Sequence, residues 1–113
     1  MEDRLRKLYL HFNAREADAV LAALSPDVDW PNGWEGGRVH GHAAVRDYWA
    51  RQWAAIDPSV EPVGFERRPD GTVAVRVHQV VRDLGGAVLA DEEVTHVYAF
   101  APDGLVRAMT IES

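Results

Sequence analysis

Three glycine-containing dipeptides divide the second half of the chain into segments rich in β-branched and aromatic residues. Each dipeptide is typical of a tight hairpin, because the central residues of such turns need positive φ angles. The dipeptides are Asp70-Gly71, Gly85-Gly86 and Asp103-Gly104. This punctuation predicts a four-stranded antiparallel meander. We expect its strands at about residues 60–69, 72–84, 87–101 and 104–112.

Apolar residues in the first part of the chain recur at the three- and four-residue spacing of a helix. One stripe runs from Leu5 to Phe12 and a second from Ala17 to Leu24, with a polar interruption between them. These stripes predict two short helices, or one bent helix, over about residues 2–24. Ser25-Pro26 is expected to stop the helical segment.

A third helical stripe, from Val45 to Ile56, predicts a helix at about residues 42–56 that Asp57-Pro58 ends. Val28 to Trp30 precedes it as a short extended piece, and a glycine-rich loop joins the two. Helices come first and strands last, which favours an α+β class with the helices on one face of a curved sheet. We therefore expect one cone-shaped domain, residues 1–113, that encloses a pocket.

All four tryptophans lie between Asp27 and Trp53, on the loop and the third predicted helix. So many large rings are typical of a concave site for a small molecule, and indole adds a hydrogen-bond donor at a wet edge. A simpler interpretation is that Trp49 and Trp53 only fill the core. The candidate substrate-binding residues are Tyr9, Trp30, Trp34, Trp49 and Trp53.

Composition excludes several classes of function. The formal net charge is -6, from 12 lysines and arginines against 18 aspartates and glutamates, which argues against nucleic acid as a partner. There is no cysteine, so thiolate chemistry and disulfides are excluded. No apolar run reaches membrane-spanning length, and we expect a cytoplasmic protein. His40 and His42 give only a weak metal signal, so we expect no metal and no cofactor.

This order of elements resembles the nuclear transport factor 2-like superfamily and, within it, the SnoaL-like group, over essentially the whole chain. The resemblance is carried by Phe12 to Trp30, by Val39 to Trp49 and by the last hairpin, VYAFAPDGLVRAM. It implies a fold shared by ketosteroid isomerases, polyketide cyclases, limonene epoxide hydrolases and non-enzymatic binding domains. It also implies a homodimer formed by sheet packing.

The resemblance to the isomerases is partial. Their aspartate base falls on Asn32, whose amide cannot take a proton at neutral pH but can bind a carbonyl or hydroxyl group. Their tyrosine falls near Leu10, next to Tyr9, and their protonated acid falls near Glu93. The epoxide hydrolases are resembled at Trp30-Pro31-Asn32. Their Asp-Arg-Asp set, however, falls on residues that are neither carboxylates nor arginine, so that mechanism is predicted to be absent.

The polar candidates on the strands depend on the hairpin register. Gln79 lies on an apolar strand face and should point into the cavity. A strict two-residue turn pairs 79 with 92 and 75 with 96, which places Glu92 and His96 on the same face. The resemblance instead favours Glu93, and a single β-bulge would exchange the two glutamates. His96 is a candidate general base or, alternatively, a residue of a dimer interface.

The leading functional hypothesis is a domain that binds a small, partly hydrophobic molecule and converts it by acid/base chemistry. The reaction would be an isomerisation, cyclisation or dehydration, with Asn32 and Gln79 orienting polar groups and Glu93 or His96 moving the proton. One alternative is a binding module without catalysis, which the amide at Asn32 favours. Another is a dimerising accessory domain whose cavity is packed core.

Overall fold

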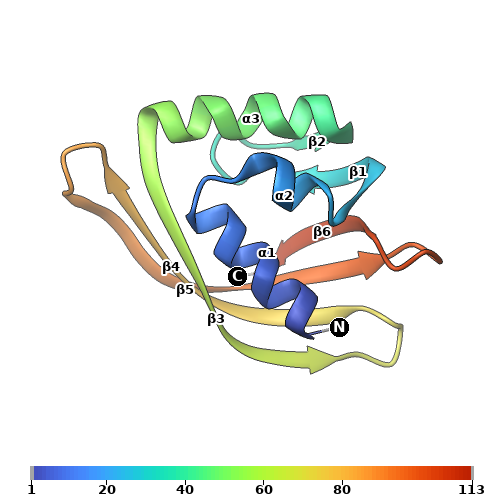
Figure 1. Cartoon of the computed structure of the whole chain (residues 1–113). Coiled ribbons are helices and arrows are strands. Elements are labelled where there is room, and N and C mark those ends of the chain that lie inside the picture. The colour runs from blue at the N-terminus through green and yellow to red at the C-terminus, as the bar shows by residue number, and fades with distance from the viewer. Residues whose placement is uncertain (1, 113) are drawn as a thin grey trace.

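The structure, a computed structural model, describes residues 2–112 as three helices on one face of a six-stranded curved sheet (Figure 1). The helices are α1 (Glu2–Asn13), α2 (Ala17–Leu21) and α3 (Gly41–Ala55). The strands are β1 (Leu24–Pro31), β2 (Arg38–His40), β3 (Ile56–Arg67), β4 (Val73–Asp83), β5 (Val88–Phe100) and β6 (Val106–Glu112).

The α+β class predicted from the sequence is confirmed, and the predicted meander corresponds to β3, β4, β5 and β6. The sheet is nevertheless larger than predicted and mixed, with the strand order β2-β1-β6-β5-β4-β3. The predicted extended piece at Val28–Trp30 belongs to the eight-residue strand β1, which pairs in parallel with β6. Parallel pairing joins segments that are distant in sequence, so no local turn signal announces it.

The first helical segment is two helices rather than one bent helix. Arg15, with φ at +63°, lies between them and breaks the helical path. Helix α3 begins and ends one residue before the prediction, and β3 follows at Ile56 without a loop. Asp57-Pro58 therefore lies within β3, which begins four residues before the predicted start of that strand at about residue 60. Pro58 is tolerated there because β3 is an edge strand, where a missing N–H need not break a ladder hydrogen bond.

Helix α1 is fastened to this edge strand. The side chain of Asn13 donates from Nδ2 to the carbonyl of Val60 over 2.7 Å and accepts from the Val60 N–H over 2.9 Å. Arg15 donates to the carbonyl of Pro58 over 2.7 Å. These bonds use backbone groups that an edge strand otherwise leaves open to another chain.

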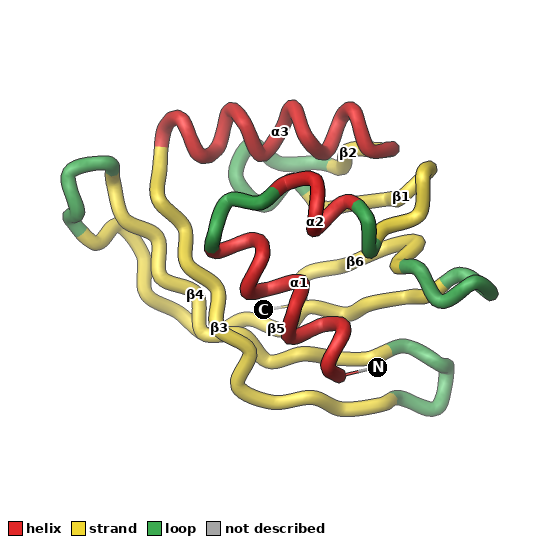
Figure 2. Tube along the Cα trace, viewed as in Figure 1, coloured by secondary structure: helices red, strands yellow, loops and turns green. Residues whose placement is uncertain are grey.

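The hydrophobic core lies between the helices and the concave face of the sheet. Figure 2 shows the arrangement of the backbone, with the helices in red on one side of the strands in yellow. Alternate residues of β4 and β5 face this core, as the two-residue period of a strand requires. Val75, Val77 and Tyr98 are completely buried there. Other residues on the same concave face line a cavity beside this core.

Candidate functional site

A cavity of about 350 Å³ lies between helices α1 and α3 and the concave face of the sheet. Its walls are mainly apolar and rich in aromatic rings, which come from α1, from β1 and the loop after it, from α3 and from β5. The aromatic lining residues are Tyr9, Phe12, Trp30, Trp34, Tyr48, Trp49 and Tyr98. The polar lining groups are concentrated at the two ends of the cavity.

At the deep end, three buried side chains form a hydrogen-bonded chain. The Tyr98 hydroxyl lies 2.7 Å from the Tyr9 hydroxyl, which in turn lies 2.8 Å from Nδ1 of His96. The exposed fractions of these side chains are 0% for Tyr98, 2% for Tyr9 and 6% for His96. The Tyr9 and His96 rings also stack, with centroids 5.8 Å apart. This chain fixes the position of the imidazole at the bottom of the cavity.

Burial determines the protonation of this deep end. It lowers the pKa of His96 to about 4, so the imidazole is neutral near pH 7. Burial also raises the pKa of Tyr9 and of Tyr98, so both hydroxyls keep their protons. An imidazole with so low a pKa takes up a proton poorly at neutral pH. The arrangement is therefore suited to donating and accepting hydrogen bonds rather than to general-base chemistry.

At the mouth, Gln79 and Glu92 face each other across β4 and β5. Gln52 of α3 also lines the cavity. Gln79 is half-buried and Glu92 is exposed. Glu92 lies four residues from His96 on the same strand face, which corresponds to about 13 Å along the strand. The cavity thus has a polar mouth, an aromatic middle and a polar deep end.

The register resolves which glutamate faces the cavity. The pairing expected from a two-residue turn is found: Gln79 pairs with Glu92, and Val75 pairs with His96. The turn itself is longer, since Asp83 N–H bonds to the Ala87 carbonyl, but a one-residue register shift near the turn restores the pairing. A bulge therefore exists, but it lies before the glutamates and does not exchange their faces.

The expectation that Glu93 lies near the pocket is therefore wrong. Glu93 lies on the outer face of the sheet, where its side chain is 56% exposed and lies 3.9 Å from the guanidinium of Arg76. The physical reason is the strand pleat, which sends consecutive side chains to opposite faces. With Glu92 lining the cavity, Glu93 cannot line it as well.

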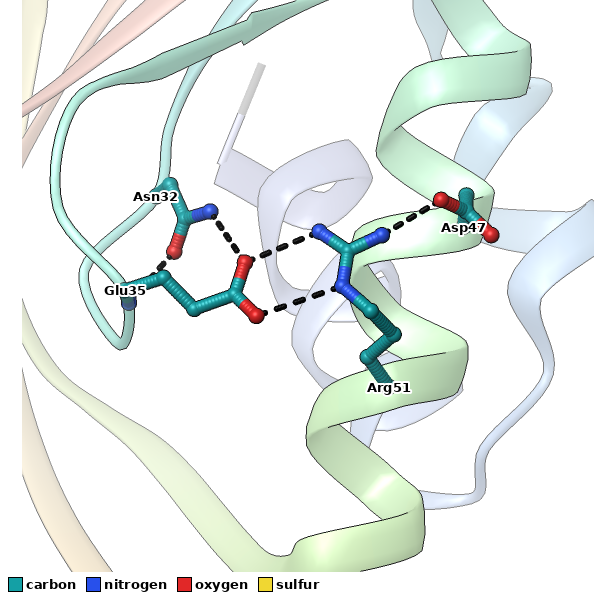
Figure 3. Close-up of polar contacts among 4 residues, drawn as sticks. All are labelled: Asn32, Glu35, Asp47 and Arg51. Carbon is teal, nitrogen blue, oxygen red and sulfur yellow. Dashed lines mark hydrogen bonds and ion pairs between the residues drawn. The ribbon is translucent and has the colours of Figure 1, made fainter.

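Asn32 is buried, but its amide is used by its own loop and does not line the cavity. Its Nδ2 donates to Oε1 of Glu35 over 2.9 Å, and its Oδ1 accepts from the Glu35 N–H over 2.7 Å. Arg51 of α3 binds both oxygens of the same carboxylate and also pairs with Asp47 (Figure 3). The hydrogen bonds from Arg51 and then from Asn32 lower the pKa of Glu35 to about 2.

This network holds the loop after β1 against α3, and the loop carries Trp34 to the cavity wall. Of the five candidate substrate-binding residues, Tyr9, Trp30, Trp34 and Trp49 line the cavity. Trp53 does not. Its ring stacks behind that of Trp49, with centroids 5.7 Å apart, and so supports the wall from outside.

Tyr48 and Tyr98 line the cavity although neither was singled out as a site residue from the sequence. The available signal was their position: Tyr98 lies two residues from His96 on the same strand face, and Tyr48 precedes Trp49 on the buried side of its helix. What the sequence does not contain is the contact between α1 and β5. That contact brings Tyr9 to His96 across 87 residues of chain.

Among residues 2–112, no group of three or more His, Asp or Glu side chains is arranged to hold a metal ion. His42 is used structurally, with Nε2 2.9 Å from the carbonyl of Leu24, and His40 lies 3.2 Å from Asp29. In the same described range, no helix has the length and hydropathy needed to cross a membrane.

Helices packed on one face of a curved, unclosed mixed sheet define the nuclear transport factor 2-like fold. The chain belongs to the SnoaL-like domain family, which matches residues 5–109. A search of curated proteins by sequence gives no match.

Solved structures of similar fold cover nearly the whole chain. A nuclear transport factor 2-like protein of unknown function from Burkholderia pseudomallei is 25% identical with a TM-score of 0.84, over 98% of this chain and 88% of that one. TerC, co-crystallised with polyporic acid, is 25% identical with a TM-score of 0.82, over 96% and 87%. A Mycobacterium tuberculosis protein in complex with estradiol-17β-hemisuccinate shares the fold at 18% identity, with a TM-score of 0.79, over 94% and 87%.

Proposed function

We propose that this domain binds a small, flat, partly hydrophobic molecule in the cavity between α1, α3 and the sheet. The observation that carries the proposal is an aromatic-walled cavity of about 350 Å³ whose polar groups lie at its two ends. This volume falls within the range of roughly 300 to 1,000 Å³ that is usual for small-molecule sites. The ligands present in the structures of TerC and of the M. tuberculosis protein, polyporic acid and estradiol-17β-hemisuccinate, support the same proposal.

A second candidate function is acid/base conversion of that ligand by isomerisation, cyclisation or dehydration. It is favoured by Glu92, a carboxylate at the cavity mouth opposite the amide of Gln79. Glu92 would move the proton, Gln79 would orient a polar group, and the neutral His96 would polarise the far end of the substrate. The amide of Asn32 contributes to this scheme only indirectly, by holding the loop that carries Trp34.

A homodimer and a cytoplasmic location remain parts of the proposal. The resemblance to the superfamily implies dimerisation through the outer face of the sheet. Sedimentation equilibrium of the purified protein tests the dimer, and fractionation of cells that produce the protein tests the location.

The binding proposal is tested by two substitutions on β5. Val94 lines the cavity, whereas Val97 is on the opposite face of the same strand and is half-buried there. Val94→Phe should obstruct the cavity and weaken binding of a flat polycyclic ligand at least tenfold, as measured by tryptophan quenching. Val97→Phe is the matched control and should bind like the wild type. A ligand that binds Val94→Phe as tightly as wild type occupies some other surface, and the proposal then fails.

Catalysis is tested by Glu92→Gln. A ligand that the wild type converts and Glu92→Gln only binds would support the second candidate. Conversion at an unchanged rate by Glu92→Gln would eliminate Glu92 as the proton-moving group.

A further inference from the structure

We propose that the deep end of the cavity recognises a neutral carbonyl-type oxygen of the ligand through the Nε2–H of His96, which Tyr98 and Tyr9 hold in that tautomer. The inference rests on the proposed ligand-binding function. It adds to that function the chemical class of the ligand and the orientation of the ligand, whose carbonyl end lies at the deep end of the cavity. Ketones, quinones, lactones and esters belong to this class, whereas carboxylates do not.

The hydrogen bonds at the deep end favour one arrangement of protons. If Nδ1 of His96 carried a proton, Tyr9 would accept it and would then either donate to Tyr98 or accept from Tyr98 as well. In the first case the Tyr98 hydroxyl proton has no acceptor among residues 2–112, and in the second case the Tyr9 hydroxyl proton has none in that range. Both tyrosines are buried, so an unused hydroxyl donor at either one is costly.

The opposite direction uses both hydroxyl protons and leaves only the Nε2–H of His96, which lines the cavity, without a protein partner among residues 2–112. Tyr98 donates to Tyr9, and Tyr9 donates to Nδ1 of His96. Nδ1 is then an acceptor, and a neutral imidazole must carry its proton on Nε2. The two tyrosines therefore act as positioning residues that select the tautomer.

Nε2 of His96 is directed at the cavity. It makes no hydrogen bond to a protein group within residues 2–112, and the imidazole lines the cavity. Nε2 is also not fully buried. Among residues 2–112, the fully buried side-chain atoms that lack a hydrogen-bond partner are Ser25 Oγ and Trp53 Nε1, and Nε2 of His96 is not one of them. A neutral N–H group is thus presented at the bottom of an aromatic cavity, where an entering ligand can accept from it.

The charges around the cavity select a neutral acceptor. The lining contains no lysine or arginine, and Glu92 at the mouth is acidic. Burial keeps His96 uncharged near pH 7, since it lowers the pKa of the imidazole. A carboxylate at the deep end would be buried without a counter-charge, which is costly, whereas a ketone oxygen needs only the one hydrogen bond.

Three naphthalene probes of similar shape test the inference by tryptophan quenching near pH 7. They are 2-acetylnaphthalene, 2-isopropenylnaphthalene, in which C=CH₂ replaces the C=O group, and 2-naphthoate. We expect the ketone to bind about tenfold more tightly than the alkene, because the alkene leaves a desolvated donor unpaired. The carboxylate should bind more weakly than the ketone.

These probes separate the inference from the function on which it rests. Equal affinities for the ketone and the alkene would overturn the inference and leave the binding function intact. Tighter binding of 2-naphthoate than of the ketone would overturn the choice of a neutral acceptor. If none of the three probes binds, the proposed function fails and the inference fails with it.

Two variants locate the donor. His96→Phe keeps a ring of similar size without an N–H and should abolish the preference for the ketone over the alkene. Gln79→Met removes the amide at the mouth and should leave that preference in place, because the carbonyl is expected at the opposite end of the cavity. A preference that survives in His96→Phe and disappears in Gln79→Met would overturn the inference.

Nitrogen NMR of the wild-type protein gives an independent test that needs no stable variant. With ¹⁵N-labelled histidine, His96 should show a protonated Nε2 and an unprotonated Nδ1, and 2-acetylnaphthalene should shift the Nε2–H signal. A protonated Nδ1 would overturn the inference. Tyr98→Phe tests the positioning role, since loss of the first donor should produce a mixture of both tautomers.

Discussion

Burial of the neutral His96 imidazole should make this protein lose stability in mild acid. The folded protein has a pKa of about 4 at His96 against the ordinary value of 6.5. As the pH falls below 6.5, the unfolded chain takes up a proton at this residue and the folded chain does not. Acid therefore favours the unfolded state. The contribution to stability is complete above the unfolded pKa and is lost as the pH falls through the folded pKa.

The size of this effect follows from the two pKa values. Lowering the pKa from 6.5 to about 4 corresponds to about 3 kcal/mol, at about 1.4 kcal/mol for each pH unit. By about pH 5 the loss from this one residue is about 2 kcal/mol, because the unfolded histidine is then almost fully protonated and the folded one is not. That is a substantial part of the roughly 5 to 15 kcal/mol that stabilises an ordinary domain.

Urea unfolding of the wild type and of His96→Gln, at about pH 7 and about pH 5, isolates the contribution. Glutamine does not titrate, and its side-chain oxygen can still accept from the Tyr9 hydroxyl. The free energy of unfolding should fall by about 2 kcal/mol more in the wild type than in the variant between the two pH values. All other titrating groups are common to both proteins. Equal falls would show that His96 is protonated as readily in the folded state as in the unfolded one, and the argument from burial would be refuted.

Three further predictions concern the walls of the cavity and the edge of the sheet. Trp49→Ala should lower the free energy of unfolding by about 3 to 5 kcal/mol in urea titration, because the side chain is 1% exposed; a loss below about 1 kcal/mol would contradict its place in the core. Asn13→Ala should cost about 1 to 2 kcal/mol by the same assay, since both backbone groups of Val60 lose a partner; an unchanged midpoint would contradict the clamp. Arg51→Ala should speed amide hydrogen exchange in the loop 32–37, because the carboxylate of Glu35 loses its anchor on α3; exchange at the wild-type rate would show that the anchor is dispensable.

The hairpins could be predicted from the sequence because their signals are local. Glycine-containing turns fixed where strands end, and the two-residue period of a strand then placed Gln79 opposite Glu92. The hairpin register alone did not decide whether Glu92 or Glu93 faces the cavity, because the resemblance to the isomerases favoured Glu93. A strand pleat allows one of two consecutive glutamates on a given face, and the hairpin pairing was the better guide.

The remaining parts of the site depend on contacts between segments that are far apart in the chain. The pairing of β1 with β6 and the approach of Tyr9 to His96 have no local sequence signal. Asn32 was predicted to bind a polar group of the ligand because the resemblance to the ketosteroid isomerases places their aspartate base at this position. In the structure Glu35, three residues further along, takes both functions of that amide.

The place of β6 in the sheet has a consequence for how this chain can be synthesised. Residues 106–112 pair with β1 on one side and with β5 on the other, so a late segment occupies the middle of the sheet. While a ribosome still holds that segment, β1 has no central neighbour and the wall that includes Met109 is missing. The nascent chain then exposes two unpaired strand borders, which are places where other chains can attach. Folding must therefore wait for the last residues of the domain to emerge, and a chaperone that shields the early strands would have its largest effect before residue 112 is released.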